Sequence, residues 1–324
     1  MKIHLFNPEN DLALAAGKAN YTPPLPVKRF KEALAQLPRW YADTNDVILT
    51  TGMTLTDLPS DAVPSPWGWS ADAVSQFQKS GFSGPFPDVE AVRRLSHRRT
   101  ALHLHRELQK SGLPYPLSPE PKEITDVNLI DSAEIILKSP WSCSGRGVVD
   151  CSNMTRESII NIAKGIIRRQ GSVMVEPKLD KIKDFALLYE SENGQIAFKG
   201  ISSFFTSTSD TTYEGNLCAS QDELRAELPE KQLNATIKAV ADALSHIIAP
   251  YYSGPIGVDM ILYGPERIIC PAIEVNLRRT MGFVALSLYE RLGRGIFRVL
   301  PRPAAGVQLV GANPYFSATF TPLS

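Results

Sequence analysis

The sequence has no excess of charge of either sign and no long apolar run. Lys plus Arg and Asp plus Glu both number 34, so the formal net charge is zero, and a basic surface of the kind that binds nucleic acid is not expected. No apolar stretch approaches the roughly 20 residues of a membrane span. The N-terminal apolar run is short and is interrupted by Glu9 and Asp11, which is not typical of a signal peptide. We therefore expect a cytoplasmic protein with no nucleic-acid or membrane partner.

Cysteine is also scarce. The four cysteines, Cys143, Cys151, Cys218 and Cys270, are widely spaced and form no CxxC pair. This spacing disfavours a disulfide framework and a zinc ribbon, and reduced thiols are expected. The sequence has neither a GxSxG elbow nor a Cys–His arrangement, so a mechanism with a side-chain nucleophile is not indicated.

The length of 324 residues, with 43% apolar residues, allows a large core and two or three lobes. A strand at 2–6, a helix at 27–37 and a strand at 46–50 predict a small parallel α/β lobe at the start of the chain. A stretch rich in Pro, Gly and Ser follows, and the pattern is then helical from 87 to 113.

The rest of the chain is predicted to be mostly β with three helices. The expected strands are 134–138, 147–150, 172–176, 183–190, 195–201, 256–262 and 267–276, and the expected helices are 155–170, 230–249 and 282–299. Residues 202–216 are small, polar and turn-rich, which predicts a mobile loop. A Pro-rich tail is expected to end the chain.

Lys138 precedes a glycine-containing segment, Ser142 to Gly147, between two strand candidates. A Walker A loop needs a Gly-Lys pair that is absent here, and a dinucleotide fingerprint needs a third glycine and a following helix. What remains is a strand–loop–strand hairpin whose tip could fold over phosphates. An ordinary hairpin turn is the alternative.

Acidic and amide side chains converge on two C-terminal strands. The turn at 263–267 folds the strands antiparallel, and this places Asp259 opposite the neighbourhood of Glu274, with Asn276 on the same face as Glu274. Buried carboxylates need a cation, and hard oxygen ligands of this kind suit Mg²⁺ with substrate phosphate. The alternative is a solvent-facing edge on which the acids pair with Arg278 or Arg279.

A third signal lies at residues 173–179, where an apolar strand ends at Pro177. The backbone leaves the sheet there, and its N–H and C=O groups become available to a ligand such as adenine. A plain strand end has the same pattern.

The order of these signals resembles the ATP-grasp superfamily over about residues 95–282: a lysine before a glycine loop, Glu-x-x-Leu at a strand exit, an aspartate, and Glu-x-Asn-x-Arg. The resemblance implies an α/β (α+β) protein in which two β-rich subdomains clamp ATP. It implies an N-terminal parallel α/β lobe over 1–95, a lid subdomain over 96–176, and a C-terminal subdomain with the magnesium site over 177–324.

The resemblance also implies roles for individual residues. Lys138 and Arg278 would be catalytic, and Asp259, Glu274 and Asn276 would bind Mg²⁺, with Mn²⁺ as an alternative. The implied ATP-binding residues are Arg98, Lys138, Ser144, Gly145, Arg146, Gly147, Glu176, Pro177, Leu179 and Asp184. Ser96-His97-Arg98 stands where the family often has an Asp-Lys pair, and Arg98 would supply the charge there.

The implied activity is an ATP-dependent ligase that joins a small carboxylate to an amine through an acylphosphate. An ATP-grasp kinase and a nucleotide-binding module without turnover are the alternatives, and a homodimer is allowed. Residues 7–11 and Trp67 to Trp69 belong to the lobe that commonly helps to hold substrate. Their alternative roles are a helix-start turn and packing within the lobe.

Overall fold

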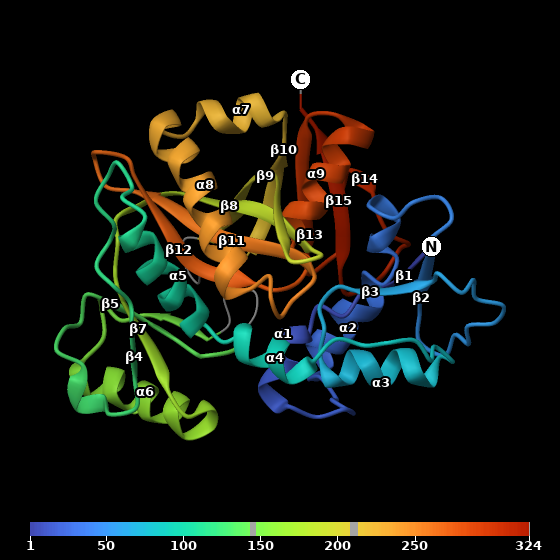
Figure 1. Cartoon of the computed structure of the whole chain (residues 1–324), viewed down its shortest axis with the longest axis horizontal. Coiled ribbons are helices and arrows are strands. Elements are labelled where there is room, and N and C mark those ends of the chain that lie inside the picture. Colours follow the sequence, from blue (N-terminus) through green and yellow to red (C-terminus); the bar gives the residue numbers. More distant parts are fainter. Residues whose placement is uncertain (143–146, 208–212, 324) are drawn as a thin grey trace.

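The computed structural model describes residues 1–142, 147–207 and 213–323, which form three β-sheets with helices packed around them (Figure 1). The sheets have three, four and eight strands in these ranges. Figure 1 shows the small N-terminal sheet beside the large sheet, with the four-stranded sheet and its helix α6 below. An α/β (α+β) architecture was expected from the sequence and is confirmed.

The N-terminal sheet consists of three parallel strands in the order β2-β1-β3. Its strands are β1 (Lys2–Leu5), β2 (Val47–Leu49) and β3 (Val63–Pro66), and the helices of this part are α1 (Asn10–Ala16), α2 (Leu25–Ala33), α3 (Ala71–Lys79) and α4 (Val89–Leu95). Ile3 and Leu5 lie on the same face of β1 and pack with Phe77 and Phe82 in one apolar cluster. The parallel lobe expected from the first 50 residues is therefore present.

The four-stranded sheet is antiparallel in the order β4-β7-β5-β6. It contains β4 (Lys122–Ile124), β5 (Ile135–Lys138), β6 (Val148–Asp150) and β7 (Val173–Pro177), and α6 (Arg156–Gln170) buries Ile159, Ala163 and Ile166 in its core. Lys138 pairs with Val148 across β5 and β6. Strands β5 and β6 thus form the antiparallel pair that the sequence predicted.

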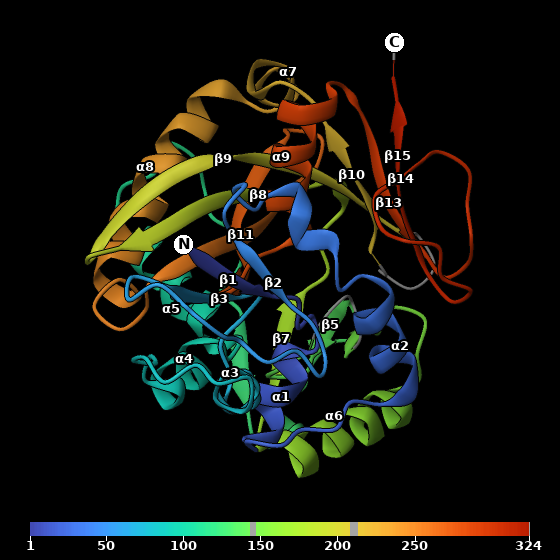
Figure 2. The same ribbon diagram turned by 90° about the vertical axis from the view of Figure 1, so that its right-hand side faces the viewer.

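The large sheet has the order β12-β11-β8-β9-β10-β13-β15-β14. Its strands are β8 (Lys181–Glu192), β9 (Gln195–Thr206), β10 (Tyr213–Cys218), β11 (Gly254–Tyr263), β12 (Ile268–Asn276), β13 (Gly295–Leu300), β14 (Val307–Gln308) and β15 (Ser317–Pro322). Helices α5 (Arg99–Lys110), α7 (Gln221–Ala226) and α8 (Glu230–Ile247) pack on one face, where Leu187 is buried. Helix α9 (Met281–Leu292) covers the other face, where Ala186 and Leu188 are buried (Figure 2).

The expected loop at 202–216 is wrong for most of its length. Residues up to Thr206 continue β9, and β10 begins at Tyr213, while 208–212 lie outside the described residues. The small side chains have a packing reason, because Ser202 is buried under α9 at the point where Gly282 approaches the sheet. A Cβ on Gly282 would lie 2.7 Å from Ser202 Oγ.

Two expected helices also differ from the structure. The helix predicted at 282–299 ends at Leu292, and Gly293, with a φ of 81°, leads into β13. The tail then adds β14 and β15 to the sheet. The helical pattern at 87–113 is broken at residues 96–98 into α4 and α5, because the Arg98 N–H bonds to the Pro140 carbonyl at 3.0 Å instead of continuing the first helix.

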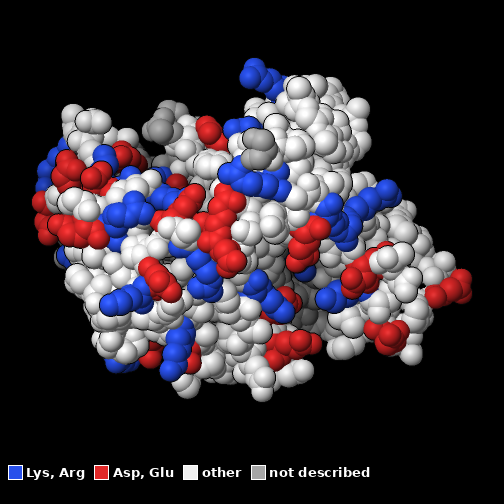
Figure 3. Space-filling view, turned by 90° about the horizontal axis from the view of Figure 1, so that it is seen from above, with Lys and Arg blue, Asp and Glu red and all other residues white. Residues whose placement is uncertain are grey.

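In the described part of the chain, none of the helices is both long and apolar enough to cross a membrane. Figure 3 shows Lys and Arg interspersed with Asp and Glu over the face seen from above.

Candidate active site

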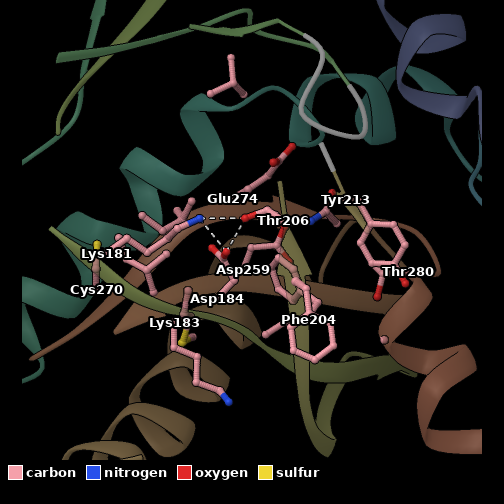
Figure 4. Close-up of a pocket in the computed structure, with 18 of the residues that line it drawn as sticks. Lys181, Lys183, Asp184, Phe204, Thr206, Tyr213, Asp259, Cys270, Glu274 and Thr280 are labelled. Atoms are coloured by element: carbon pink, nitrogen blue, oxygen red, sulfur yellow. Dashed lines mark hydrogen bonds and ion pairs between the residues drawn. The ribbon is translucent and has the colours of Figure 1, made fainter. Parts of the chain in front are cut away.

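One large cavity of 1610 Å³ opens where the three sheets meet. Residues from β5, β7, β8, β9, β11 and β12 line it, together with residues of the N-terminal lobe and the C-terminal strands. Figure 4 shows Asp259, Glu274 and Asp184 directed into this space from the large sheet. Among the predicted site residues that the structure describes, Arg98, Lys138, Glu176, Pro177, Leu179, Asp184, Asp259, Glu274, Asn276 and Arg278 line the cavity.

Three predicted metal ligands come together on the β11–β12 hairpin and are called the acid trio below: Asp259, Glu274 and Asn276. Asp259 pairs directly with Glu274 across the two strands, and the Asn276 amide nitrogen donates to Asp259 Oδ2 at 3.0 Å. The register shifts just beyond this pair, where β12 contains Pro271. A bulge or an edge strand is where proline is tolerated in a sheet, and β12 is the edge strand.

The charges of the acid trio are partly balanced by arginines. Burial raises the pKa of Asp259 to about 7, the negative charge of Glu274 adds to this rise, and Arg278 and the hydrogen bond from Asn276 oppose it. Arg98 Nη2 contacts Glu274 Oε1 at 3.0 Å and also donates to Ser142 Oγ at 2.9 Å. Its Nε is buried and has no partner among the described residues, which leaves a donor for an anion in the cavity.

Arg278 is held by the N-terminal lobe. Its Nε donates to Asp11 Oδ2 at 2.9 Å, and its backbone forms a β-bridge with Gly68. The next residue, Arg279, donates its N–H to the Trp67 carbonyl at 2.7 Å. A Cβ on Gly68 would lie 2.4 Å from the end of the Asn10 side chain and 3.0 Å from Arg278 Cβ, so the close approach requires glycine.

The predicted substrate segments in the N-terminal lobe make this contact, and Pro8 and Trp67 of these segments also line the cavity. Asn7 donates to the Gly68 carbonyl at 2.8 Å and accepts from the Gly68 N–H at 3.3 Å. Oriented to donate, the Asn10 amide reaches the Gly68 and Trp69 carbonyls. Trp67 is buried, with 3% of its surface exposed. Residues 7–11 and Trp67 to Trp69 therefore fasten the lobe to the strand extension that carries Arg278.

Lys138 forms a buried ion pair with Glu176 across β5 and β7, with Nζ 2.5 Å from Oε2. The two side chains are 7% and 11% exposed. Of the glycine segment beside them, Gly147 is described and has a φ of 85°. The predicted phosphate-binding residues Ser144, Gly145 and Arg146 lie outside the described residues.

The exit of β7 presents backbone groups to the cavity. Strand β4 pairs only with Val173 to Val175, so it has ended before Pro177. The Lys178 N–H donates to the Glu134 carbonyl at 3.1 Å, toward the β5 side. Because the peptide between Pro177 and Lys178 is planar and trans, the Pro177 carbonyl points away from β5. Among the described residues, the Leu179 N–H has no backbone acceptor. One acceptor and one donor are thus available together.

Two residues next to Asp184 were not predicted as site residues from the sequence. Lys181 Nζ and Thr206 Oγ1 each contact Asp184 Oδ2 at 2.7 Å, and Lys181 Nζ also donates to Thr206 at 2.9 Å (Figure 4). Strict alternation would place Lys181 on the face of Lys183, which pairs with Glu227. The register shift between β8 and β11 at this end accompanies the approach of Lys181 to Asp184 instead, so alternation did not single it out. Thr206 had been assigned to a loop, and nothing in the sequence linked it to Asp184.

His97 has a structural environment, in line with the absence of a predicted role. Its ring stacks edge-on against Trp141 at 4.5 Å, and its Nδ1 accepts from the Arg99 N–H at 3.0 Å. Burial lowers the pKa of His97 to about 4, and the nearby Arg99 contributes to this shift, whereas Glu123 opposes it.

Comparison with solved structures identifies the arrangement. The protein is similar to phosphoribosylamine–glycine ligase from Thermotoga maritima, with 12% identity over 99% of this chain and 90% of that chain at a TM-score of 0.57. It is similar to N5-carboxyaminoimidazole synthase from Aspergillus clavatus, solved with ADP and 5-aminoimidazole ribonucleotide, with 12% identity over 99% and 94% at 0.52. A protein from Archaeoglobus fulgidus described as an ATP-grasp superfamily protein matches over 100% of both chains, with 12% identity at 0.50. The chain has the ATP-grasp fold. No protein-family model and no curated protein sequence matches it.

Within the ATP-grasp fold, the acid trio provides a donor set that fits magnesium. Across the described ranges, no group of three or more His, Cys, Asp and Glu side chains is placed to hold a metal ion. The trio offers two carboxylates and one amide oxygen, which is too few ligands for a closed protein site. Mg²⁺ commonly takes one or two carboxylates together with phosphate oxygens and water. The donor set therefore suits a metal that arrives with a nucleotide.

Proposed function

We propose that the protein is an ATP-dependent ligase that joins a small carboxylate to an amine through an acylphosphate. The proposal rests on one observation above all: the acid trio, Arg98, Lys138 and Arg278 line a single cavity of an ATP-grasp fold. Oxygen ligands for Mg²⁺ and three cations are thus gathered where a phosphoryl group could be transferred. The N-terminal lobe, the lid over 96–176 and the subdomain over 177–324 would be the three working parts.

The nucleotide would lie between the four-stranded sheet and the large sheet. Adenine would bond to the Pro177 carbonyl and the Leu179 N–H, the acceptor and donor at the exit of β7. Asp184, braced by Lys181 and Thr206, would accept from the ribose. Lys138 and the backbone of the segment ending at Gly147 would approach the phosphates. Binding of ADP by the Aspergillus protein of the same fold supports this assignment.

Charge neutralisation would come from both the protein and the metal. Asp259, Glu274 and the Asn276 amide oxygen would hold Mg²⁺ (or Mn²⁺), which supplies positive charge against the phosphate oxygens when bound. Arg98 would direct its unpartnered Nε toward the phosphates. Arg278, fixed by Asp11, would face the phosphoryl group in transfer, where preorganised donors are most effective because they need no reorientation.

The chemistry would proceed in two balanced steps. A carboxylate oxygen attacks the γ-phosphorus, forming an O–P bond while the bond between that phosphorus and the β–γ bridging oxygen breaks and ADP leaves. The amine nitrogen then attacks the acyl carbon, the C–O bond to phosphate breaks, and inorganic phosphate leaves as the nitrogen loses a proton to solvent. The cavity walls would exclude water, which would otherwise hydrolyse the acylphosphate.

The test is an assay with Mg-ATP and pools of small carboxylic acids and amines. A ligase releases phosphate only when both co-substrates are present, and oxygen-18 in the carboxylate appears in the released phosphate. A kinase needs one co-substrate and leaves it phosphorylated, whereas a binding module releases nothing above the blank. Transfer of no oxygen-18 during amide formation would contradict the acylphosphate.

A variant pair makes the test specific to the site. Glu274→Gln keeps the side-chain size but removes a charge of the acid trio, and we expect turnover to fall at least about 100-fold. Asp242→Asn makes the same type of change on the exposed side of α8, outside the cavity, and should leave turnover unchanged. Equal activity of the two variants would argue against the acid trio as the metal site.

A further inference from the structure

The cavity extends past the acid trio into a second region with a different lining. We call this region the apolar arm and define it by Val27, Phe30, Trp67, Met281, Val299 and Phe316. These residues come from α2, the segment after β3, α9, β13 and the segment before β15. Met281 follows Arg278 by three residues, so the arm begins beside the proposed position of the transferred phosphoryl group.

The arm is built on packed rings. The Phe30 and Phe316 rings meet edge-on with centroids 5.1 Å apart, and the Phe6 ring packs against Trp67 at 5.0 Å. Val27 and Trp67 are buried, with 7% and 3% of their surfaces exposed. A rigid apolar wall next to a few polar groups is typical of a small-molecule pocket.

Positive charge is directed away from the arm. Among the described lining residues, no Lys or Arg comes from α2, α9, β13 or the C-terminal strands. The cations of α2 are otherwise engaged: Lys31 Nζ lies 2.6 Å from Glu9 Oε1, and the Arg29 guanidinium lies 4.1 Å from the Tyr315 ring centroid. Lys28 is exposed and lies 3.9 Å from Glu32.

These two properties discriminate between classes of substrate. A phosphorylated sugar would bring a dianion into the arm, and such a group needs cationic donors that this lining does not offer. An aromatic ring or a branched aliphatic group would instead exchange water for contact with the apolar residues of the arm. The arm and Arg278 line the same cavity. A ligand in the arm would therefore lie next to the proposed reaction centre, as a substrate does.

We propose that the apolar arm selects the carboxylate substrate: a small acid whose side group is an aromatic ring or a branched aliphatic chain. This inference rests on the proposed ligase function and deepens it. The carboxylate would lie beside Arg278, and the side group would extend toward Phe30 and Phe316.

The experiment uses hydroxylamine as the amine, because it captures any acylphosphate as a hydroxamate whatever the natural amine is. The full-length protein is given Mg-ATP, hydroxylamine and, separately, phenylalanine, leucine, alanine, aspartate or 3-phosphoglycerate. We expect kcat/KM for phenylalanine or leucine to exceed that for alanine by about 10-fold or more, the range for added apolar groups in a fitted pocket. Aspartate and 3-phosphoglycerate should be poorer still.

A matched pair of variants tests the location. Val299→Phe fills the arm, whereas Val307→Phe makes the same change on the exposed strand β14, outside the cavity. Val299→Phe should lower kcat/KM for the best acid by about 10-fold and leave alanine within about twofold. Val307→Phe should alter neither. An equal loss for both acids in Val299→Phe, or a preference for 3-phosphoglycerate, would overturn the proposal.

The outcomes separate this inference from the proposed function. Hydroxamate formed only from alanine, aspartate or 3-phosphoglycerate would support the ligase function and refute selection of the acid by the apolar arm. If no acid yields hydroxamate, thermal stabilisation by phenylalanine or leucine with a non-hydrolysable ATP analogue is measured. Stabilisation that is lost in Val299→Phe would support binding of the acid in the apolar arm and refute the ligase chemistry. If neither acid stabilises the protein, both proposals are refuted.

Discussion

The buried ion pair between Lys138 and Glu176 offers a way to separate a structural role from a nucleotide-binding role. Lys138→Met removes the ammonium and leaves the Glu176 carboxylate only 11% exposed without its cation. Removing one partner of a buried pair costs about 3–5 kcal/mol of unfolding free energy. That is a large share of the stability of about 5–15 kcal/mol that is usual for a protein domain.

The double variant Lys138→Met/Glu176→Gln removes both charges. Because no uncompensated charge remains, we expect it to recover more than half of the stability that the single variant loses. Nucleotide affinity should behave differently, since Lys138 is proposed to contact the phosphates. Losing a hydrogen bond to a charged group is worth about 1.5–3 kcal/mol, so the Kd for ATP should rise roughly 10- to 150-fold in both variants.

Denaturant unfolding gives the stabilities, and calorimetric titration with Mg-ATP gives the affinities. The informative comparison is the double variant, which is expected to be clearly more stable than Lys138→Met and still deficient in binding. If it bound ATP as tightly as the wild type, Lys138 would be a structural residue of the four-stranded sheet. If Lys138→Met alone were fully stable, the pair would not be isolated from water as its burial indicates.

Three further predictions follow from contacts outside the nucleotide region. Asp11→Asn keeps the size of the side chain that fixes Arg278 but removes its charge, so kcat should fall about 10-fold with the Kd for ATP unchanged; a change in Kd alone, measured by titration, would contradict this. Gly68→Ala should destabilise the fold by about 1–3 kcal/mol in denaturant unfolding because its Cβ would overlap Asn10, whereas Gly311→Ala, which has open space, should not. His97 is neutral in the fold down to a pKa of about 4, while the unfolded chain binds the proton near 6.5, so stability should fall as the pH drops from 6.5 to 4. The loss amounts to at most about 3 kcal/mol, and His97→Asn should flatten this part of a stability–pH curve; an unchanged slope would show that other groups cause it.

Local patterns predicted the elements of the chain well wherever one face of the element is apolar. The hairpins at β5–β6 and β11–β12 followed from short apolar runs separated by turn residues. The predictions were wrong where a small polar side chain is present because of close packing. Ser202 looks like a loop residue, yet it is small because α9 packs closely on that part of β9. Similarly, no proline interrupts residues 282–299, and only Gly293 and Gly295 mark the change from helix to strand.

The residues of the candidate site also differ in how far their contacts depend on local sequence. Asp259 and Asn276 are 17 residues apart on one hairpin, so strand alternation and a turn were enough to place them together. Asp11 and Arg278 are 267 residues apart, and their contact depends on how the N-terminal lobe meets β12, which no local pattern encodes. Glycine at position 68 could have been recognised only as a turn residue, although its role is to let two chain segments touch. Most of the residues proposed to bind ligand directly could therefore be selected from the sequence, whereas those that hold them in position became visible only in the folded chain.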